Sequence, residues 1–421
     1  MSLFAFLKIC AQLLLLTTFL HRFNQTHNSD GDTPMNAIFK KLSASVVLAC
    51  TALSGAAQAE MLAGTDVKFS GYIKLDAMVS DYSEGSLGAQ NLNRDFYIPS
   101  LTPVSGFEED AHFDSHARQS RFRFSTTTDT AEGDKIIGVL EFDFLVTNNG
   151  NERISNSYTP RMRHAFLKYK NWTVGQTWST FMDVGVLPET VDFIGVTDAT
   201  IFDRQPLVRY TSGSWEFALE NPETTVTPNG GGARIVADDN TVPDFVARYT
   251  SKQDWGYIKV AGLLRQIAYE NGADIDGQES AWGISVTSKI NFDNGDDIRI
   301  ILNGGSGLGR YIGLNAANGA VITPDGDLEA IDSMGYAISY RHLWNSQMRS
   351  SLTFSALDID NDSALTGTSV TESTYSTRVN LMYSPTKAIT IGAEYAFAHR
   401  EVESGLEGDM NRFQVMAKYA F

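Results

Sequence analysis

Arginine and lysine side chains recur at alternate positions of otherwise apolar segments in this sequence. Arg121 and Arg123, for example, alternate with Phe122 and Phe124, so that basic and apolar side chains would project from opposite faces of a strand. Guanidinium groups bind carboxylates through paired hydrogen bonds and keep their charge at physiological pH. A face built in this way can therefore attract and contact anions. The residues that share this position in their segments are Lys74, Arg121, Arg123, Arg161, Arg163, Arg209, Arg248, Arg265, Arg299, Arg341 and Arg378.

The chain as a whole is acidic, so these basic positions stand out. It holds 50 Asp and Glu against 33 Lys and Arg, for a formal net charge of −17. This balance argues against a nucleic-acid partner, because phosphates would be repelled. Many carboxylates fall in polar connecting segments such as 108–110, 358–362 and 401–409. Glu141 and Asp143 share the face of the arginines, and an alternative is that the arginines only pair with such acids as structure.

Other chemistry has weaker signals in this sequence. His112 and His116 flank Asp114 but lack a nearby Cys or a His-Glu-x-x-His pattern, so a solvated loop is the better interpretation. The segment 358–369 begins like a calcium-binding loop but lacks Gly and Glu at the sixth and twelfth positions. His164 is a faint candidate for an esterase or phospholipase, without a defensible Ser-His-Asp spacing. We therefore expect no catalytic residue, no metal site and no cofactor.

The beginning of the chain has the pattern of an export leader. A basic pair, an apolar stretch and a small-x-small sequence follow one another from Met35 to Ala59, in the order of a secretory signal. We interpret residues 35–59 as a signal peptide and residues 1–34 as an extension upstream of the true start, with a signal anchor as the alternative. Both cysteines precede residue 60, so the exported domain, residues 60–421, would contain no disulfide.

Apolar and polar residues alternate with a period of two to the end of the chain, which is typical of β-strands. Counting such segments gives about sixteen strands and no convincing amphipathic helix. The connections alternate between short gaps, such as 212–214, and long ones, such as 81–114 and 304–332. Short turns at one end and long loops at the other are typical of a transmembrane barrel. We predict one all-β domain, a transmembrane antiparallel up-and-down barrel.

Aromatic residues favour the same architecture. Trp172, Trp215, Trp255 and Trp344 lie within or beside short gaps, where a membrane barrel carries an aromatic girdle. The last segment alternates as far as Phe421, which leaves an apolar strand at the chain end. Soluble proteins seldom expose such an edge. A soluble sandwich with these aromatic residues in its core is the alternative.

The segment 177–204 is the predicted constriction loop. It is rich in Val, Ile, Phe and Gly, so it would be poorly placed in bulk water, and we expect it to fold into the barrel. Its acids, Asp183, Glu189, Asp192 and Asp198, would then face the arginine wall across the pore. Because like charges in a water-filled pore select counter-ions, this arrangement would favour anions.

Several motifs together resemble the DcaP-like porins. They are RQSRF (118–122), RMRHA (161–165), GQTWSTFMD (175–183), RQP (204–206) and LENPET (219–224), with 96–103 similar as well. The resemblance spans residues 60–421. It implies a sixteen-stranded, trimeric outer-membrane porin of a Gram-negative bacterium that favours small anions, particularly dicarboxylates. Some members carry an N-terminal coiled-coil segment, whereas residues 60–65 here lead almost directly into the first strand.

Two alternatives to a porin remain open at this point. One is an outer-membrane barrel enzyme of the esterase or phospholipase type. The other is a plugged barrel that serves adhesion or structure. Steady ion conductance across a planar bilayer would separate a pore from both, since a plugged barrel does not pass ions. For the porin, the expected partners are small anionic solutes, outer-membrane lipid and two further copies of the chain.

Overall fold

The computed structural model describes residues 64–146, 150–151 and 155–421. The chain divides into two compact units, Met1–Asp66 and Val67–Phe421. The predicted signal peptide and the extension before it lie outside the described residues and stay predictions. None of the helices in the described part is long and apolar enough to cross a bilayer.

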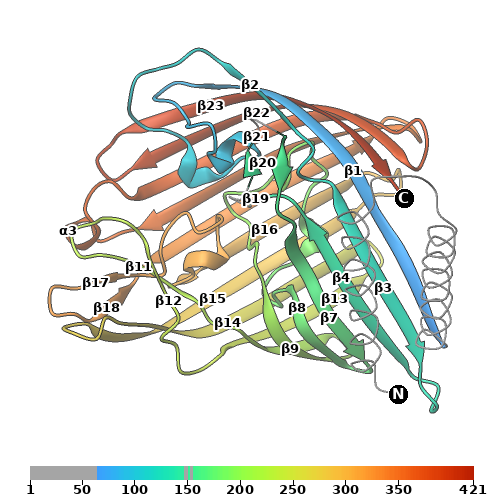
Figure 1. Cartoon of the computed structure of the whole chain (residues 1–421), viewed down its shortest axis with the longest axis horizontal. Coiled ribbons are helices and arrows are strands. Elements are labelled where there is room, and N and C mark those ends of the chain that lie inside the picture. The colour runs from blue at the N-terminus through green and yellow to red at the C-terminus, as the bar shows by residue number, and fades with distance from the viewer. Residues whose placement is uncertain (1–63, 147–149, 152–154) are drawn as a thin grey trace, which may run out of the picture. The chain divides into compact units, whose positions relative to one another are not determined.

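Sixteen antiparallel strands close into a barrel in the second unit (Figure 1). Each strand pairs with the next along the chain, and β23 pairs with β1 from Met410 opposite Tyr82 to Ala420 opposite Tyr72. The short strand β2 (His112–His116) adds to β1 beside β3. The predicted all-β barrel is confirmed. Its strands are β1 (Thr65–Tyr82), β3 (Arg121–Asp129), β4 (Lys135–Asp143), β7 (Arg161–Tyr169), β8 (Trp172–Trp178), β9 (Arg204–Ser212), β10 (Trp215–Glu220), β13 (Asp244–Gln253), β14 (Gly256–Glu270), β15 (Asp276–Asn291), β16 (Asp297–Ser306), β19 (Asp332–Leu343), β20 (Met348–Asp360), β21 (Thr371–Tyr383), β22 (Ile389–Val402) and β23 (Glu407–Ala420).

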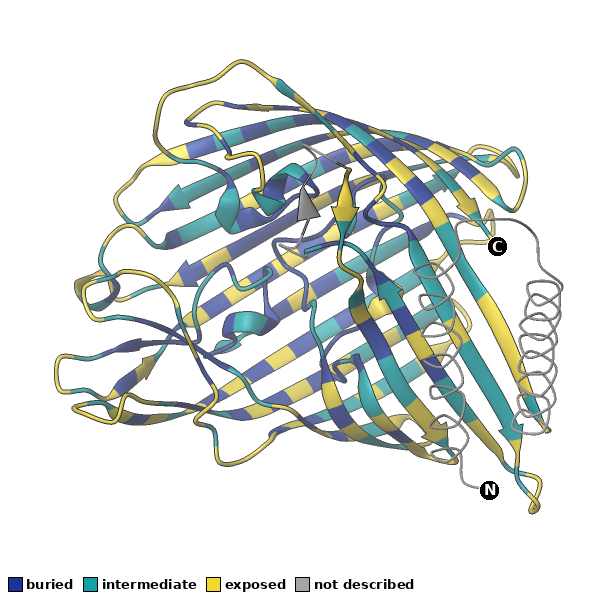
Figure 2. Ribbon diagram, viewed as in Figure 1, coloured by how far each residue is buried: buried dark blue, intermediate teal, exposed yellow. Residues whose placement is uncertain are grey.

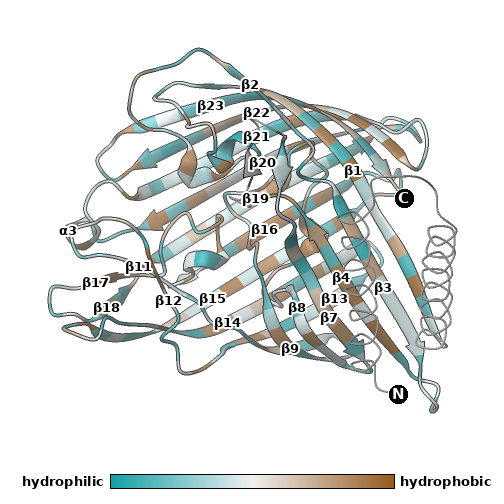
Figure 3. Cartoon of the chain, in the orientation of Figure 1, coloured by the Kyte–Doolittle hydropathy of each residue, from teal (hydrophilic) through white to brown (hydrophobic). Residues whose placement is uncertain are grey.

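The strands turn their apolar side chains outward. Along β19, Met334, Tyr336 and Ile338 are exposed while Gly335 and Ala337 between them are buried. Figure 2 shows this alternation as bands along the strands, and Figure 3 shows the corresponding change in hydropathy. An apolar outer surface with a polar interior is the inverse of a soluble protein and suits a barrel embedded in lipid. The period-two pattern of the sequence therefore maps directly onto the inner and outer faces.

The connections differ in length at the two ends of the barrel. At one end the gaps are short, such as residues 170–171, 213–214 and 344–347. At the other end they include residues 83–111, 144–160, 179–203, 221–243 and 307–331, although 271–275 and 403–406 are also short. The predicted tryptophans beside the short turns are 40–60% exposed, as a girdle at the membrane surface requires. They are Trp172, Trp215, Trp255 and Trp344.

The long loops carry secondary structure of their own. Two of them, 221–243 and 307–331, are joined because a four-stranded sheet combines strands from both, with β11 parallel to β17. The smaller elements are η1 (Leu92–Arg94), η2 (Pro99–Leu101), β5 (Gly150–Asn151), β6 (Ser157–Tyr158), η3 (Val184–Val186), β11 (Thr224–Thr227), β12 (Ile235–Ala237), η4 (Gly309–Tyr311), β17 (Ala320–Ile322), β18 (Leu328–Ala330) and α3 (Ser363–Thr366).

Of the predicted constriction loop (177–204), residues 179–203 connect β8 to β9 and fold into the barrel as predicted; they are called the constriction loop below. Val191 O accepts a hydrogen bond from Lys74 Nζ of β1 at 2.7 Å, whereas Ala199 O accepts one from Asn303 Nδ2 of β16 at 2.7 Å. Because β1 and β16 lie far apart in the strand order, the loop spans the interior. The apolar character of the loop explains this position, since its Phe181 and Met182 are buried with residues of loop 307–331 and of β20.

The asymmetry of the connections predicts the orientation of the barrel in the membrane. Ser363 lies in α3 at the long-loop end and Ser346 lies in a short turn, and both are exposed. We expect a membrane-impermeant maleimide to label Ser363→Cys on intact cells and Ser346→Cys only after permeabilisation, because outer-membrane barrels expose their long loops to the exterior. Labelling of Ser346→Cys alone on intact cells would contradict this orientation.

Candidate functional site

Two carboxylates on β4 organise an arginine cluster on the inner wall. Arg161 donates from Nε and Nη2 to the two oxygens of Asp143, each at 2.9 Å. Arg163 donates to Glu141 Oε1 and to Asp143 Oδ2, again at 2.9 Å. A β-bulge where β7 pairs with Glu141 supports this geometry, since a bulge re-aims side chains locally. Arg163 is 2% exposed, and both arginines make their close contacts with these two acids. Their charges are therefore largely taken up by Glu141 and Asp143.

Arg121 and Arg123 of β3 complete the cluster with longer contacts. Arg121 lies 3.6 Å from Glu141 and 3.7 Å from Asp143, and Arg123 lies 3.8 Å from Glu141. The side chain of Arg123 is 43% exposed and that of Arg121 is 21% exposed. Four guanidinium groups thus share two carboxylates, which leaves an excess of two positive charges on this wall. The sequence predicted all four arginines, and the structure brings them together.

A second group of cations surrounds one acid on β16. Arg299 and Arg341 lie 2.7 Å and 2.8 Å from Asp297, and Lys289 lies 3.8 Å from it. Asp297 is buried, and the three cations keep 11–25% of their side-chain surface exposed. This group also carries an excess of two positive charges. Of its three cations, Arg299 and Arg341 are in the predicted set.

The remaining predicted cations hold other parts of the structure. Lys74 lies 2.9 Å from Asp76, besides its hydrogen bond to the constriction loop. Arg209, Arg248 and Arg265 all donate to main-chain carbonyl groups. The acceptors are Trp178 for Arg209, Met182 for Arg248, and Gly307 and Leu308 for Arg265. These residues lie on the inner face, and their hydrogen bonds hold the ends of the inward-folded segments against the wall. Their side chains therefore stabilise the fold.

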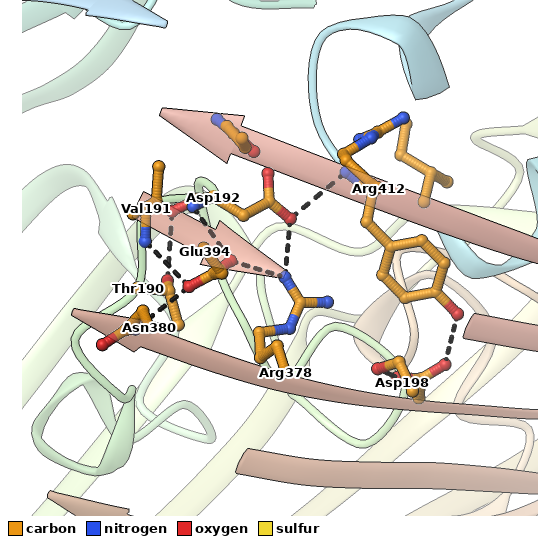
Figure 4. A network of polar contacts seen from close by, with 12 residues as sticks. Thr190, Val191, Asp192, Asp198, Arg378, Asn380, Glu394 and Arg412 are labelled. Carbon is orange, nitrogen blue, oxygen red and sulfur yellow. Dashed lines mark hydrogen bonds and ion pairs between the residues drawn. The ribbon is translucent and has the colours of Figure 1, made fainter. Parts of the chain in front are cut away.

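The acids of the constriction loop are paired with side chains of other strands. Asp192 lies 2.9 Å from Arg378 of β21, which is buried and also lies 3.5 Å from Glu394 of β22. Figure 4 shows this network, in which Glu394 also accepts a hydrogen bond from Val191 N at 3.0 Å. Asp198 accepts from Tyr97 at 2.7 Å. These contacts tie the loop to β21, β22 and loop 83–111.

Asp183 and Glu189 extend the same pattern. Asp183 accepts from Lys259 at 2.5 Å and from Tyr257 and Thr287 at 2.9 Å, and Glu189 pairs with Arg349. Burial alone would raise the pKa of Asp183, but the Lys259 charge and the hydrogen bonds outweigh it, and the pKa lies below its ordinary value. All four predicted loop acids therefore have cationic or hydroxyl partners on β14, β15, β20 or β21, or in loop 83–111.

Sequence reasoning omitted several cations that contribute to this interior. Arg349 and Arg412 share the inward parity of their strands, with Arg349 in register with Ser351 and Thr353. Their parity would have identified them. Arg204 and Arg234 were also omitted, and for these no such signal exists. Arg204 alternates with the buried Gln205 on β9, and Arg234 lies in a loop.

The closed sixteen-stranded barrel, its apolar outer face and its charged interior define an outer-membrane channel of the porin class. A family model for the DcaP outer membrane protein matches residues 40–421, so the chain belongs to this family. This agrees with the resemblance carried by the sequence motifs.

Solved structures show the same fold. The outer membrane channel DcaP of Acinetobacter baumannii is 22% identical, with a TM-score of 0.70 over 85% of this chain and 98% of that one. An anion-selective porin from Comamonas acidovorans has a TM-score of 0.52 at 11% identity, over 85% of this chain and 100% of that one. OmpT of Vibrio cholerae has a TM-score of 0.52 at 12% identity, over 85% and 98%. None of the curated proteins that were compared matches the chain.

The buried anchor of the constriction loop predicts a response to acid. Because the pKa of Asp183 is lowered by folding, its anchor is fully present above the ordinary carboxyl pKa of 3.8 and is lost as pH falls through the lowered value. We expect Asp183→Asn to remove the same anchor at pH 7. The loop should then move more, which gives larger current fluctuations and lowers the unfolding free energy by roughly 1–3 kcal/mol. Single-channel recording and urea titration measure the two effects.

A matched control for this variant lies in an exposed loop. Asp110 is exposed, so Asp110→Asn makes the same chemical change without removing an anchor. Its currents and unfolding midpoint should equal those of the unchanged protein. Equal behaviour of the two variants would show that Asp183 does not hold the loop.

Proposed function

We propose that this channel lets small solutes diffuse across the outer membrane with a preference for anions, particularly dicarboxylates. The observation that carries the proposal is the arginine cluster, in which four guanidinium groups share only Glu141 and Asp143. Its least engaged members, Arg121 and Arg123, keep exposed surface toward the lumen. A passing anion can therefore contact positive charge that the protein itself does not neutralise.

The strength of this contact suits conduction. Two unit charges 4 Å apart interact by about 1 kcal/mol in bulk water and by about 4 kcal/mol at an effective dielectric constant near 20. Interactions of this size offset part of the dehydration of an anion without holding it irreversibly, as a conducting pore requires. A dicarboxylate gains twice, because its second carboxylate can contact another guanidinium group of the cluster.

The acids of the lumen do not cancel this preference. The constriction-loop acids Asp183 and Glu189 are each paired with a cation, and Asp192 shares Arg378 with Glu394. One negative charge is thus left at Arg378, against the excess of two positive charges in the arginine cluster and two in the group around Asp297. Selectivity is set by these two groups, not by the net charge of the chain.

The proposal includes the surroundings of the channel. The protein is exported with a signal peptide that is cleaved after Ala59, and it assembles as a homotrimer in the outer membrane. The neighbouring solved structures support the barrel fold, and anion selectivity is stated in the name of the Comamonas acidovorans porin. For this chain, the support for selectivity is the arrangement of its own arginines.

Arg121 and Arg123 are the residues to change, because Arg163 is needed to hold the acids. The variant Arg121→Gln/Arg123→Gln removes two positive charges, each of which interacts with a passing anion by about 1 kcal/mol or more. We expect the anion-to-cation permeability ratio to fall roughly fivefold or more, and dicarboxylate flux to fall more than neutral-sugar flux. Reversal potentials in a salt gradient and liposome swelling measure the two quantities.

The control removes the same charge elsewhere. Lys252 and Lys387 are exposed at the short-turn end, and Lys252→Gln/Lys387→Gln should leave the permeability ratio almost unchanged. Unaltered selectivity in a folded Arg121→Gln/Arg123→Gln protein would show that the arginines are structural. A folded protein without steady conductance would favour a plugged barrel.

A further inference from the structure

A cavity of about 490 Å³ lies at the long-loop end of the barrel, apart from the carboxylates of the arginine cluster. Residues of loops 83–111, 179–203, 221–243 and 307–331 line it, together with Val146, Gln176 of β8 and the first residues of β7 and β9. Much of its wall is apolar, with Leu92, Phe96, Phe193 and Phe202 among the lining residues. Cavities of this size and composition are typical of sites for small organic ligands.

Two arginines in this wall form no salt bridge with any of the described residues. Arg204 and Arg234 both line the cavity, and no carboxylate of the described residues lies within salt-bridge distance of either. Arg204 Nη1 is buried without a hydrogen-bond partner in the described part of the chain. Its guanidinium group lies over the rings of Trp178, at 4.4 Å, and Phe202, at 5.6 Å. Stacking of this kind fixes the group but leaves its N–H donors free.

Arg234 is held by amide groups in a similar way. It donates to Asn318 Oδ1 at 2.6 Å and to Asn315 O at 2.5 Å. These neutral acceptors orient the guanidinium group without cancelling its charge. Arg234 is exposed, so its charge is open to a ligand that enters the cavity.

The other charged residues of the cavity are already paired. Arg161 is bound to Asp143 of the arginine cluster, and Asp203 lies 3.4 Å from Arg310. Among the described residues, the cavity therefore carries an excess of two positive charges beside an apolar wall. The buried Nη1 of Arg204, which has no hydrogen-bond partner among these residues, costs free energy that a carboxylate ligand would recover.

We propose that this cavity binds organic carboxylates that carry an apolar body, such as an aromatic ring system. The carboxylate lies against Arg204 and Arg234, and the apolar body packs on Leu92, Phe96 and Phe193. Because Arg161 belongs to both the cavity wall and the arginine cluster, a bound solute stands next to the first charges of the lumen. The role as an entry site rests on the proposed function, whereas binding itself can be tested separately.

The test uses 2-naphthoate as the probe and calorimetry on the purified full-length protein. We expect 2-naphthoate to bind, and the neutral 2-naphthalenemethanol and the small dianion succinate to bind about tenfold more weakly or not at all, because each lacks half of the recognised chemistry. Arg204→Gln and Arg234→Gln should each weaken 2-naphthoate binding about tenfold, as expected for loss of a charged hydrogen-bond donor.

Two further variants separate binding in the cavity from a general effect of charge. Lys252 is exposed at the short-turn end and does not line the cavity, so Lys252→Gln removes one positive charge and should bind 2-naphthoate as the unchanged protein does. Ser100 lines the cavity, and Ser100→Phe should abolish binding by filling the space without changing charge. Binding in Ser100→Phe equal to that of the unchanged protein would overturn the proposal.

Other results would also overturn it. The proposal fails if 2-naphthoate does not bind the folded protein, or if Arg204→Gln and Arg234→Gln bind it unchanged. If 2-naphthoate does not bind and Arg204→Gln separates an oligomer into single chains, the partner of Arg204 is an acid of a second copy. Loss of selectivity in Arg121→Gln/Arg123→Gln reports on the proposed function alone, so the two proposals can fail independently.

Discussion

Closure of the hydrogen-bond ladder between β23 and β1 is the constraint on which the rest of the structure depends. In the hydrocarbon layer no water is available for an open strand edge, so each backbone N–H and C=O must find a partner in a neighbouring strand. The pairing from Met410 to Ala420 with β1 removes both edges at once. Once the sheet is closed, alternate side chains must point into a shared interior. Charged residues on that parity are thereby concentrated in a small space.

This concentration explains the two uses of cations in the lumen. Some neutralise the acids or bind the carbonyl groups of the constriction loop, as Lys259 and Arg248 do. A loop inside a barrel has few neighbours that could satisfy its polar groups, so the wall must supply donors. Others exceed the local acids, as in the arginine cluster. This excess positive charge lies inside a wall of low dielectric constant, so it acts on a solute in the lumen over a longer distance than the exterior carboxylates do. Solvent and salt screen the exterior carboxylates.

The barrel, its strand number and the inward fold of the constriction loop could be predicted from the sequence, because each depends on a local signal. Period-two alternation gives the strands, and the apolar content of a long gap gives the buried loop. The partners of the loop acids were beyond that reasoning. Asp183 meets Lys259 and Asp192 meets Arg378, and such pairs depend on how far around the barrel the loop extends, which no local pattern encodes.

Arg204 marks the limit of the parity rule. Gln205 and Leu207 are buried on β9, so the rule assigns Arg204 to the opposite face. At the first residue of the strand, however, the wall ends and the loops begin, so inner and outer faces lose their meaning. Arg204 lies on Trp178, the last residue of the neighbouring strand, and reaches the cavity that the loops enclose. The surroundings of a charge at a strand end are therefore set by the loops, which is why a cavity with unpaired arginines can lie at the rim of the wall.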